Sequence, residues 1–336
     1  MTERRRPPTM ADVAARAGVS HQTVSRVLND MPGVRAATAE RVQQAIDELG
    51  YRRNLSARLL ASTRSRTIGV ATWGNSQFGP QQVLLALDDA ARQSGYRLVT
   101  TTLRTMTEQG TRAAVEELLE QGVEAVVLVI PHETVLRFAT EVDLGLPTLV
   151  VEGDLSRTPL TAGVDNVEGA AIATRHLLEL GHTTVCHVAG PPGWSEARAR
   201  VEGWRMELEA QGRPVPPLRW GGDWSPRSGY EAGRSLARDP EVTAVFCAND
   251  QMAMGVIAAL RDAGRTVPDD VSVVGFDDLP ESAYIDPPLT SVRQDFDELG
   301  RRAMGLVERV LAGEPRPSAD LVPTTLVVRR STAAPR

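Results

Sequence analysis

Apolar residues recur at helical spacing through the N-terminal part of the chain. One stripe runs through residues 9–17, another through 24–28, and a third lies between Ala37 and Leu49. Gly18 interrupts the first stripe, and Gly50 follows the third at a place where helices commonly stop. The pattern therefore predicts three short helices, which together can bury a small core.

A tight turn joins the first two predicted helices. Thr9 is followed three residues later by Asp12, the spacing of a capping box, and Ser20 can cap the second helix. The apolar residues of that second helix share one side, and its polar residues share the other. These polar residues are His21, Gln22, Ser25, Arg26 and Asn29. A helix-turn-helix presents its second helix to the DNA major groove in this way, although a solvated surface helix shows the same period.

The run from Ala17 to Asn29, Ala-Gly-Val-Ser-His-Gln-Thr-Val-Ser-Arg-Val-Leu-Asn, closely resembles the recognition segment of the lac repressor (LacI/GalR) family of bacterial transcription regulators. The resemblance implies that residues 1–53 form a DNA-binding domain. The residues expected to contact DNA are Thr9, Ser20, His21, Gln22, Thr23, Ser25, Arg26 and Asn29. Gln22 suits adenine and Arg26 suits guanine, so both are expected to read base edges, together with His21.

Residues 54–66 form a linker that is rich in leucine rather than in glycine and serine. A helix of about two turns is marginal alone in water. In the family that the chain resembles, this segment is a hinge helix that folds when two copies pair over the minor groove. By that resemblance Asn54, Ala57 and Leu60 contact DNA, with Leu60 as a wedge between base steps. Arg53 stands where the family often has proline, which leaves the stiffness of the hinge open.

Strands and helices alternate from Thr67 onward. The strand-like runs are Ile68–Thr72, Leu98–Thr102, Ala125–Ile130, Thr148–Glu152, Val185–Ala189, Ala244–Ala248, Ser272–Phe276 and, near the end, Leu326–Val328. Helical segments include Gln81–Ser94, Thr111–Gln121, Ala170–Leu180 and Gln251–Ala263. The alternation predicts an α/β fold in which helices cover parallel sheets, with too many strands for one small sheet.

Residues 67–336 are therefore expected to form a two-lobed core. The resemblance implies a type I periplasmic-binding-protein-like topology, with one lobe at about 67–163 and 294–323 and the other at about 164–293 and 324–336. The late stretch Thr290–Gln294 is expected to cross back to the first lobe.

Polar residues follow several of the predicted strands, at the end of an open α/β sheet where ligands bind. Glu152 follows one strand, Asn249 and Asp250 another, and Asp277 and Asp278 a third. Carboxylates and an amide suit a neutral polyhydroxylated ligand, because they accept hydrogen bonds from hydroxyl groups. Each residue also has a structural reading: an aspartate at a strand end is commonly a turn or cap residue.

The family resemblance covers nearly the whole chain, including Ala197–Trp204 and Ser272–Asp278. It implies an effector site made by Trp73, Phe78, Glu152, Arg200, Trp224, Asn249, Asp277, Gln294 and Phe296. In that site Arg200, Asn249 and Asp277 hold sugar hydroxyls and Trp224 stacks on the ring. The residues at Trp73, Phe78 and Glu152 depart from the family's pattern, so the substituent of the sugar stays open.

Charge and motifs narrow the function classes. Residues 1–66 contain 12 Arg and 6 Asp or Glu, whereas the rest of the chain is acidic, which is typical of a nucleic-acid-binding module on a body with another role.

No apolar run approaches the ~20 residues of a membrane span, and no secretory signal is evident, so we expect a cytoplasmic protein without a membrane partner. Cys186 and Cys247 are expected to be buried, inert thiols. No metal-ligand or phosphate-loop spacing occurs, so we expect neither metal, cofactor nor catalysis.

The sequence thus predicts a transcriptional repressor that binds a palindromic operator in double-stranded DNA as a homodimer. A small carbohydrate, most favourably a galactoside, is expected to release it. A dimer is expected because the chain ends at Arg336 without the leucine-heptad tail that makes tetramers in the family. The alternatives are a corepressor-type regulator of the same family and a cytoplasmic sugar-binding protein without regulation.

Overall fold

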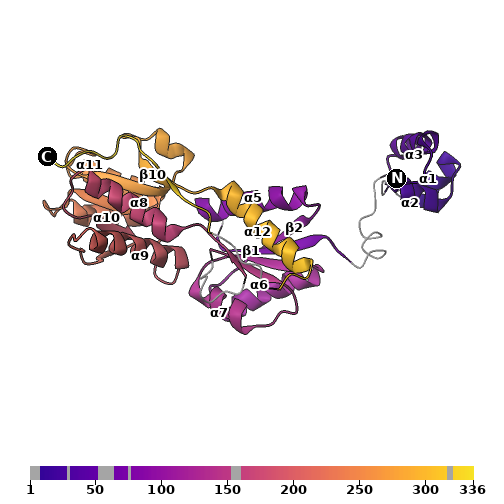
Figure 1. The fold of residues 1–336 in the computed structure, drawn as a ribbon, viewed down its shortest axis with the longest axis horizontal. Helices are drawn as coiled ribbons and strands as arrows, with labels where there is room; N and C mark the ends of the chain where they lie inside the picture. The colour runs from indigo at the N-terminus through magenta and orange to yellow at the C-terminus, as the bar shows by residue number, and fades with distance from the viewer. Residues whose placement is uncertain (1–7, 29–30, 52–63, 75–76, 153–159, 316–320) are drawn as a thin grey trace, which may run out of the picture. The chain divides into compact units, whose positions relative to one another are not determined.

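The chain folds as two compact units, Met1–Ser65 and Arg66–Arg336 (Figure 1). A computed structural model describes residues 8–28, 31–51, 64–74, 77–152, 160–315 and 321–336. In that part of the chain no helix is both long enough and apolar enough to cross a bilayer.

The N-terminal unit contains the three predicted helices. They are α1 (Met10–Ala17), α2 (His21–Leu28) and α3 (Ala36–Leu49). Thr9 and Asp12 form the capping box, in which the Asp12 carboxylate accepts from the Thr9 backbone N–H at 2.7 Å. Gly18 ends α1 in the left-handed region at φ 65°, and the Ser20 hydroxyl accepts from the Thr23 backbone N–H at 3.1 Å. The structure therefore confirms the predicted capping box, glycine stop and serine cap.

A small apolar core holds these helices together. Val13, Val24 and Val42 are fully buried, one from each helix, and Tyr51 closes the core after α3. Val24, Val27 and Leu28 hold α2 against this core, whereas His21, Gln22 and Arg26 of the same helix are exposed.

The first lobe of the second unit is a parallel sheet with the strand order β2-β1-β3-β4-β5. Its strands are β1 (Thr67–Thr72), β2 (Arg97–Thr102), β3 (Ala125–Val129), β4 (Thr148–Val151) and β5 (Thr161–Ala162). Its helices are α5 (Phe78–Gln93), α6 (Glu108–Glu120), α7 (Glu133–Glu141) and α12 (Phe296–Leu311). Successive residues of β3 pack on opposite sides, Val127 with α5 and α12, Val126 with α6 and α7, so helices cover both faces.

The second lobe repeats this arrangement with the strand order β11-β10-β9-β8-β6-β7. Its strands are β6 (Cys186–Ala189), β7 (Trp220–Gly221), β8 (Ala244–Cys247), β9 (Ser272–Asp277), β10 (Thr290–Arg293) and β11 (Thr325–Val327). Its helices are α8 (Asn166–Glu179), α9 (Ser195–Ala210), α10 (Pro226–Leu236) and α11 (Asp250–Asp262), with a short 3-10 helix at Pro280–Ala283. Cys186 and Cys247 are buried and unpaired, and burial raises the pKa of the Cys186 thiol to about 11.

The lobes are joined where the chain passes from one sheet to the other. Two of the connecting segments lie side by side, since Val164 and Val322 form a parallel bridge. The lobes also touch directly: His132 after β3 and Trp194 before α9 form an antiparallel bridge, and their rings meet edge to face at 5.7 Å.

Two expectations from the sequence need correction. Thr290–Arg293 does not cross to the first lobe; it is β10 and pairs in parallel with β9, so the crossing begins only at Gln294. The core is also not wholly parallel, because β11 pairs with β10 in the antiparallel direction at one sheet edge. Short strands carry little periodicity, so direction and sheet membership depend on contacts made at long range.

Glycine lets α5 and α12 approach closely on the first lobe. A Cβ atom built on Gly300 of α12 would lie 2.6 Å from the backbone of Ala86 on α5. Gly305, one and a half turns further along α12, has no atom within 4 Å of the same position.

We expect Gly300→Ala to destabilise the core and Gly305→Ala to stabilise it. Forcing a methyl group into the packed contact costs about 1–3 kcal/mol, whereas alanine in open helix gains up to ~1 kcal/mol over glycine. Urea denaturation of both variants measures the two free energies of unfolding. An equal gain in both would show that α5 and α12 do not pack at Gly300.

Candidate functional sites

Helix α2 presents most of the residues expected to contact DNA. His21, Gln22 and Arg26 are exposed along it, Thr23 and Ser25 are half-buried, and Val24 between them is buried. Ser20 is exposed just before the helix, where its hydroxyl caps it. Thr9 is half-buried at the start of α1 with its hydroxyl 2.6 Å from Asp12 Oδ2. Asn29, Asn54, Ala57 and Leu60 lie outside the described residues, as does most of the predicted hinge.

A cavity in the second unit collects residues from both lobes. About 600 Å³ of space lies outside protein atoms here, and part of that space is open solvent. Eight of the nine residues expected at the effector site line it: Phe78, Glu152, Arg200, Trp224, Asn249, Asp277, Gln294 and Phe296. Trp73 does not; it is half-buried and packs against an apolar cluster of the core.

Arg200 of α9 lies at the centre of the cavity's polar side, with 4% of its surface exposed. Its Nε donates to Asn166 Oδ1 at 2.9 Å, and its Nη1 donates to the backbone carbonyl of Ala248. Its Nη2 lies 3.7 Å from Asp277 Oδ1, and its guanidinium carbon stands 3.7 Å from the ring centre of Phe276. The charge is thus compensated on several sides, as a buried guanidinium requires.

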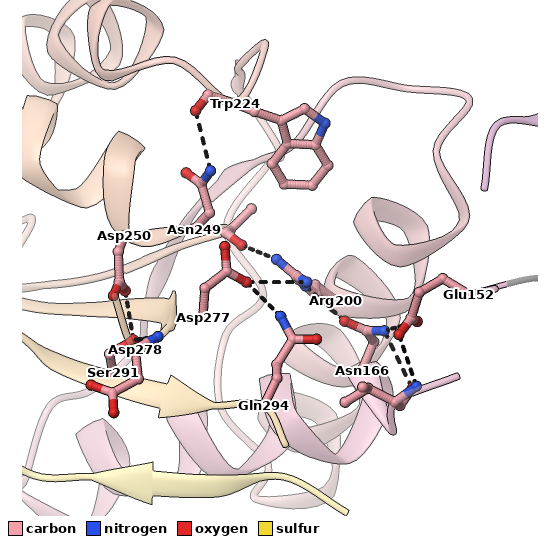
Figure 2. A network of polar contacts seen from close by, with 12 residues as sticks. Glu152, Asn166, Arg200, Trp224, Asn249, Asp250, Asp277, Asp278, Ser291 and Gln294 are labelled. Carbon is pink, nitrogen blue, oxygen red and sulfur yellow. Dashed lines mark hydrogen bonds and ion pairs between the residues drawn. The ribbon is translucent and has the colours of Figure 1, made fainter. Parts of the chain in front are cut away.

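The contacts of Arg200 extend into a network that links the lobes (Figure 2). Asn166 donates its amide to Glu152 Oε2 at 2.8 Å, and the Val164 backbone N–H donates to Glu152 Oε1 at 2.9 Å. At the other end, Gln294 donates to Asp277 Oδ1 at 2.5 Å. Glu152 belongs to the first lobe and Asp277 to the second, so hydrogen bonds and the Arg200–Asp277 ion pair together connect the two lobes.

Three carboxyl groups line this cavity, and burial raises the pKa of each. Desolvation takes the pKa of Glu152 to about 7, although the N–H groups of Val164 and Asn166 and the charge of Arg200 oppose it. Desolvation likewise raises the pKa of Asp277 to about 6, against Arg200 and Gln294. Glu196 is the third, with a pKa raised to about 8 by burial and by the neighbouring acids.

Asn249 and Trp224 are fixed by the second lobe. Asn249 caps α11, because its Oδ1 accepts from the Met252 backbone N–H at 2.9 Å, and its Nδ2 donates to the Trp224 carbonyl at 3.1 Å. Trp224 has a left-handed backbone at φ 71°. Its indole lies on Gly190, where a Cβ atom would come within 2.3 Å of the ring. The tryptophan is therefore both packed and part of the cavity wall.

Aromatic and aliphatic side chains line the apolar side of the cavity. Phe78 at the start of α5 and Phe296 at the start of α12 meet edge to face with 5.9 Å between ring centres. The same apolar surface also includes Pro80, Val83, Val129 and Pro131. A polar side next to an apolar wall suits a ligand with hydroxyl groups and a hydrophobic face.

Both units of the chain match known protein families. Residues 9–54 match the family described as bacterial regulatory proteins, lacI family, and residues 174–332 match the periplasmic binding protein-like domain. The lactose operon repressor of Escherichia coli (strain K12) is 35% identical over 333 residues, which cover 98% of this chain and 92% of that repressor. The chain belongs to the lacI family of bacterial transcriptional regulators.

Other members of the lacI family agree with this assignment. The regulator CelR of Thermobifida fusca is 36% identical over 344 residues, covering 98% of this chain and 99% of CelR. The crystal structure of the lac repressor dimer bound to operator and the anti-inducer ONPF has a TM-score of 0.88 at 34% identity, covering 98% of this chain and 100% of that one. A CelR–cellobiose complex has a TM-score of 0.73 at 32% identity, with 96% and 99% covered.

The predicted family, fold class and non-enzymatic role are thereby confirmed. This lacI-family member is a DNA-binding transcriptional repressor, with a helix-turn-helix domain and a periplasmic-binding-protein-like core of the sugar-binding type.

Two acids expected at the cleft of this lacI-family repressor are structural instead (Figure 2). Asp250 is fully buried and accepts from the Leu279 backbone N–H at 2.8 Å and the Ser291 hydroxyl at 2.5 Å. Asp278 pairs with Arg293 at 2.7 Å and with Arg329 at 2.6 Å. Asp250 joins the start of α11 to β10 and to the loop after β9, and Asp278 joins that loop to β10 and to the segment after β11. Neither acid lines the cavity.

Conversely, the sequence reading missed Asn166 and Glu196. Glu196 precedes Arg200 by four residues on α9, a spacing that places both on one helix face and so could have revealed it. Asn166 begins α8 directly after the crossing segment, and no local pattern marks it.

The contribution of Glu196 to the free energy of unfolding should fall as the pH rises from about 4.5, the ordinary pKa of glutamate, to about 8, the pKa of Glu196 in the fold. Over this window the folded chain holds a proton that the unfolded chain has released, so raising the pH favours unfolding. Glu196→Gln removes this uptake and should flatten the pH dependence measured by urea denaturation. Identical slopes in the variant and the wild type would contradict the burial of this carboxyl group.

Proposed function

We propose that this repressor binds a palindromic operator as a homodimer in the cytoplasm and is released by a small sugar, with a galactoside as the favoured class. The observation that carries the proposal is a network of polar contacts that reaches from Glu152 through Asn166, Arg200 and Asp277 to Gln294. It consists of hydrogen bonds and of one ion pair, Arg200–Asp277, beside a cavity lined by both lobes. A ligand that replaces contacts in this network acts on both lobes together.

The DNA half of the proposal rests on α2. His21, Gln22 and Arg26 are exposed on the second helix of a helix-turn-helix, where they can reach base edges in the major groove. Two copies related by a two-fold axis would read two half-sites of opposite direction. We further propose that residues 54–66 act as the hinge, with Asn54 and Ala57 against the minor groove and Leu60 as the wedge.

The sugar half rests on the chemistry of the cavity. Arg200 donates, Asp277 and Glu152 accept, and Asn249 does both, which matches the mixed donor and acceptor character of sugar hydroxyls. The indole of Trp224 offers a surface for the apolar face of a pyranose. A galactoside is favoured because lactose operon repressors of two bacteria are among the relatives. The CelR–cellobiose complex supports a glucoside as the second candidate.

Release would follow from a difference in affinity. A sugar that binds one lobe arrangement better than the other shifts the population toward it, and the coupling in allosteric proteins is typically ~1–3 kcal/mol. A corepressor of the same family would act with the opposite sign, strengthening the DNA complex.

The proposal is tested by selecting bound duplexes from a random library with the full chain. Lactose, methyl β-D-galactoside, cellobiose and ribose are then added to the selected complex in gel shifts. We expect an inverted repeat to emerge and a galactoside to dissociate it. Equal binding to scrambled duplexes at physiological ionic strength would refute the DNA half, and tighter binding with sugar would establish corepression.

Asp277→Asn should abolish release by the sugar while leaving operator affinity unchanged. The substitution removes the charge facing Arg200, and asparagine tolerates the left-handed backbone of this position, φ 102°, better than alanine does. Gel shifts with and without sugar measure both properties.

Glu231→Gln is the matched control, because it removes a carboxylate from an exposed pair with Arg227 on α10 and should change neither property. Loss of operator binding in Asp277→Asn would instead assign Asp277 a role in holding the DNA-binding form.

A further inference from the structure

Glu196 has a position in the effector cavity that the proposed function does not use. It is the second residue of α9, one turn before Arg200, and it lines the cavity beside Trp224. It also lines a second cavity that contains Glu152, Asn166 and Ser195. Glu196 and Glu152 therefore stand where the two cavities adjoin.

One carboxyl oxygen of Glu196 is left without a partner. Its Oε2 is buried, and among the described residues it makes no hydrogen bond. By contrast, both oxygens of Glu152 accept hydrogen bonds, from Val164 and from Asn166. A buried acceptor without a donor is costly, so a site of this kind gains from a ligand that supplies one.

Arg200, the arginine among the residues that line the effector cavity, does not supply that donor. The guanidinium of Arg200 is already directed to Asn166, the Ala248 carbonyl and Asp277. The pKa of Glu196, raised to about 8, is consistent with the missing donor. Burial and the acids Glu152 and Asp277 raise this pKa by more than the charge of Arg200 lowers it.

We propose that Glu196 is a specificity-determining residue, whose buried carboxyl group makes a hydrogen bond with one O–H or N–H group of the effector and so fixes which hydroxyl of a sugar must be present. The inference rests on the proposed function and narrows it. The ligand it describes is a neutral or amino sugar, with a donor group directed at the first turn of α9. A sugar that lacks this one group loses the contact and leaves the carboxyl oxygen unpaired.

The test is a double-mutant cycle between protein and ligand. Methyl β-D-galactoside and its 2-, 3-, 4- and 6-deoxy analogues are titrated into the wild type, Glu196→Ala and Glu196→Gln, and binding is followed by calorimetry. The glucoside series replaces the galactoside series if only the glucoside binds. Glu209→Ala, on an exposed part of the same helix, is the control.

We expect one deoxy analogue to bind the wild type at least about tenfold more weakly than the parent sugar does. The same analogue and the parent sugar should bind Glu196→Ala with equal affinity. The other analogues should show the same ratios in all proteins, and Glu196→Gln, which keeps one acceptor oxygen, should fall between. Binding of the selected operator verifies that each variant is folded. If Glu196→Ala does not fold, the isosteric variant Glu196→Gln still measures the contribution of Glu196 to sugar binding.

The outcomes separate the two proposals. If the parent sugar binds but no analogue responds to Glu196, the inference is overturned and the sugar-released repressor stands. If neither parent series binds the wild type, the sugar-effector proposal fails, and the role of Glu196 fails with it.

Discussion

The buried charge of Arg200 is the constraint on which the effector site depends. A guanidinium group does not lose its proton in a protein, so burial obliges the surrounding chain to compensate it. The compensation comes from places far apart in the sequence: Asn166 at the start of α8, the carbonyl of Ala248 after β8, and Asp277 at the end of β9. The ring of Phe276 covers one face of the group, within range of a cation–π contact.

This compensation also explains how the lobes can sense one ligand. Asn166 serves both Arg200 in the second lobe and Glu152 in the first, so the position of each lobe enters the same hydrogen-bond network. Ser195 adds a second link, since its hydroxyl lies 2.8 Å from the carbonyls of Pro131 and Glu152. A ligand that alters partners at Arg200 therefore changes the energy of the interface between the lobes, which is what allosteric release requires.

The acids of the core divide into two groups by what surrounds them. Asp250 and Asp278 face hydroxyl, amide and guanidinium groups of neighbouring loops, and they hold those loops. Asp277 and Glu152 face the cavity, where desolvation raises their pKa values and leaves them ready to exchange partners. The adjacent residues Asp277 and Asp278 thus differ in position, since Asp277 lines the cavity and Asp278 joins two segments of the second lobe.

The sequence by itself determined the features that depend on neighbours three or four residues away. Helices α1 to α3, the capping box at Thr9, the glycine stop at Gly18 and the exposed face of α2 follow from local spacing. The alternation of strands and helices likewise predicted an α/β core, and polar residues at strand ends indicated Arg200's partner Asp277.

Only the tertiary structure decided which of two adjacent acids enters the cavity, that Trp73 stays outside it, that Glu196 lines it, and that Asn166 joins Arg200 to Glu152. Asp277 and Asp278 both have left-handed backbones, at φ 102° and φ 53°, and the partners of their side chains lie at least 15 residues away in the sequence, so no local pattern separates the two acids. The direction of β11 and the place of β10 were decided in the same way, because hydrogen bonds between short strands form only once the lobes are assembled.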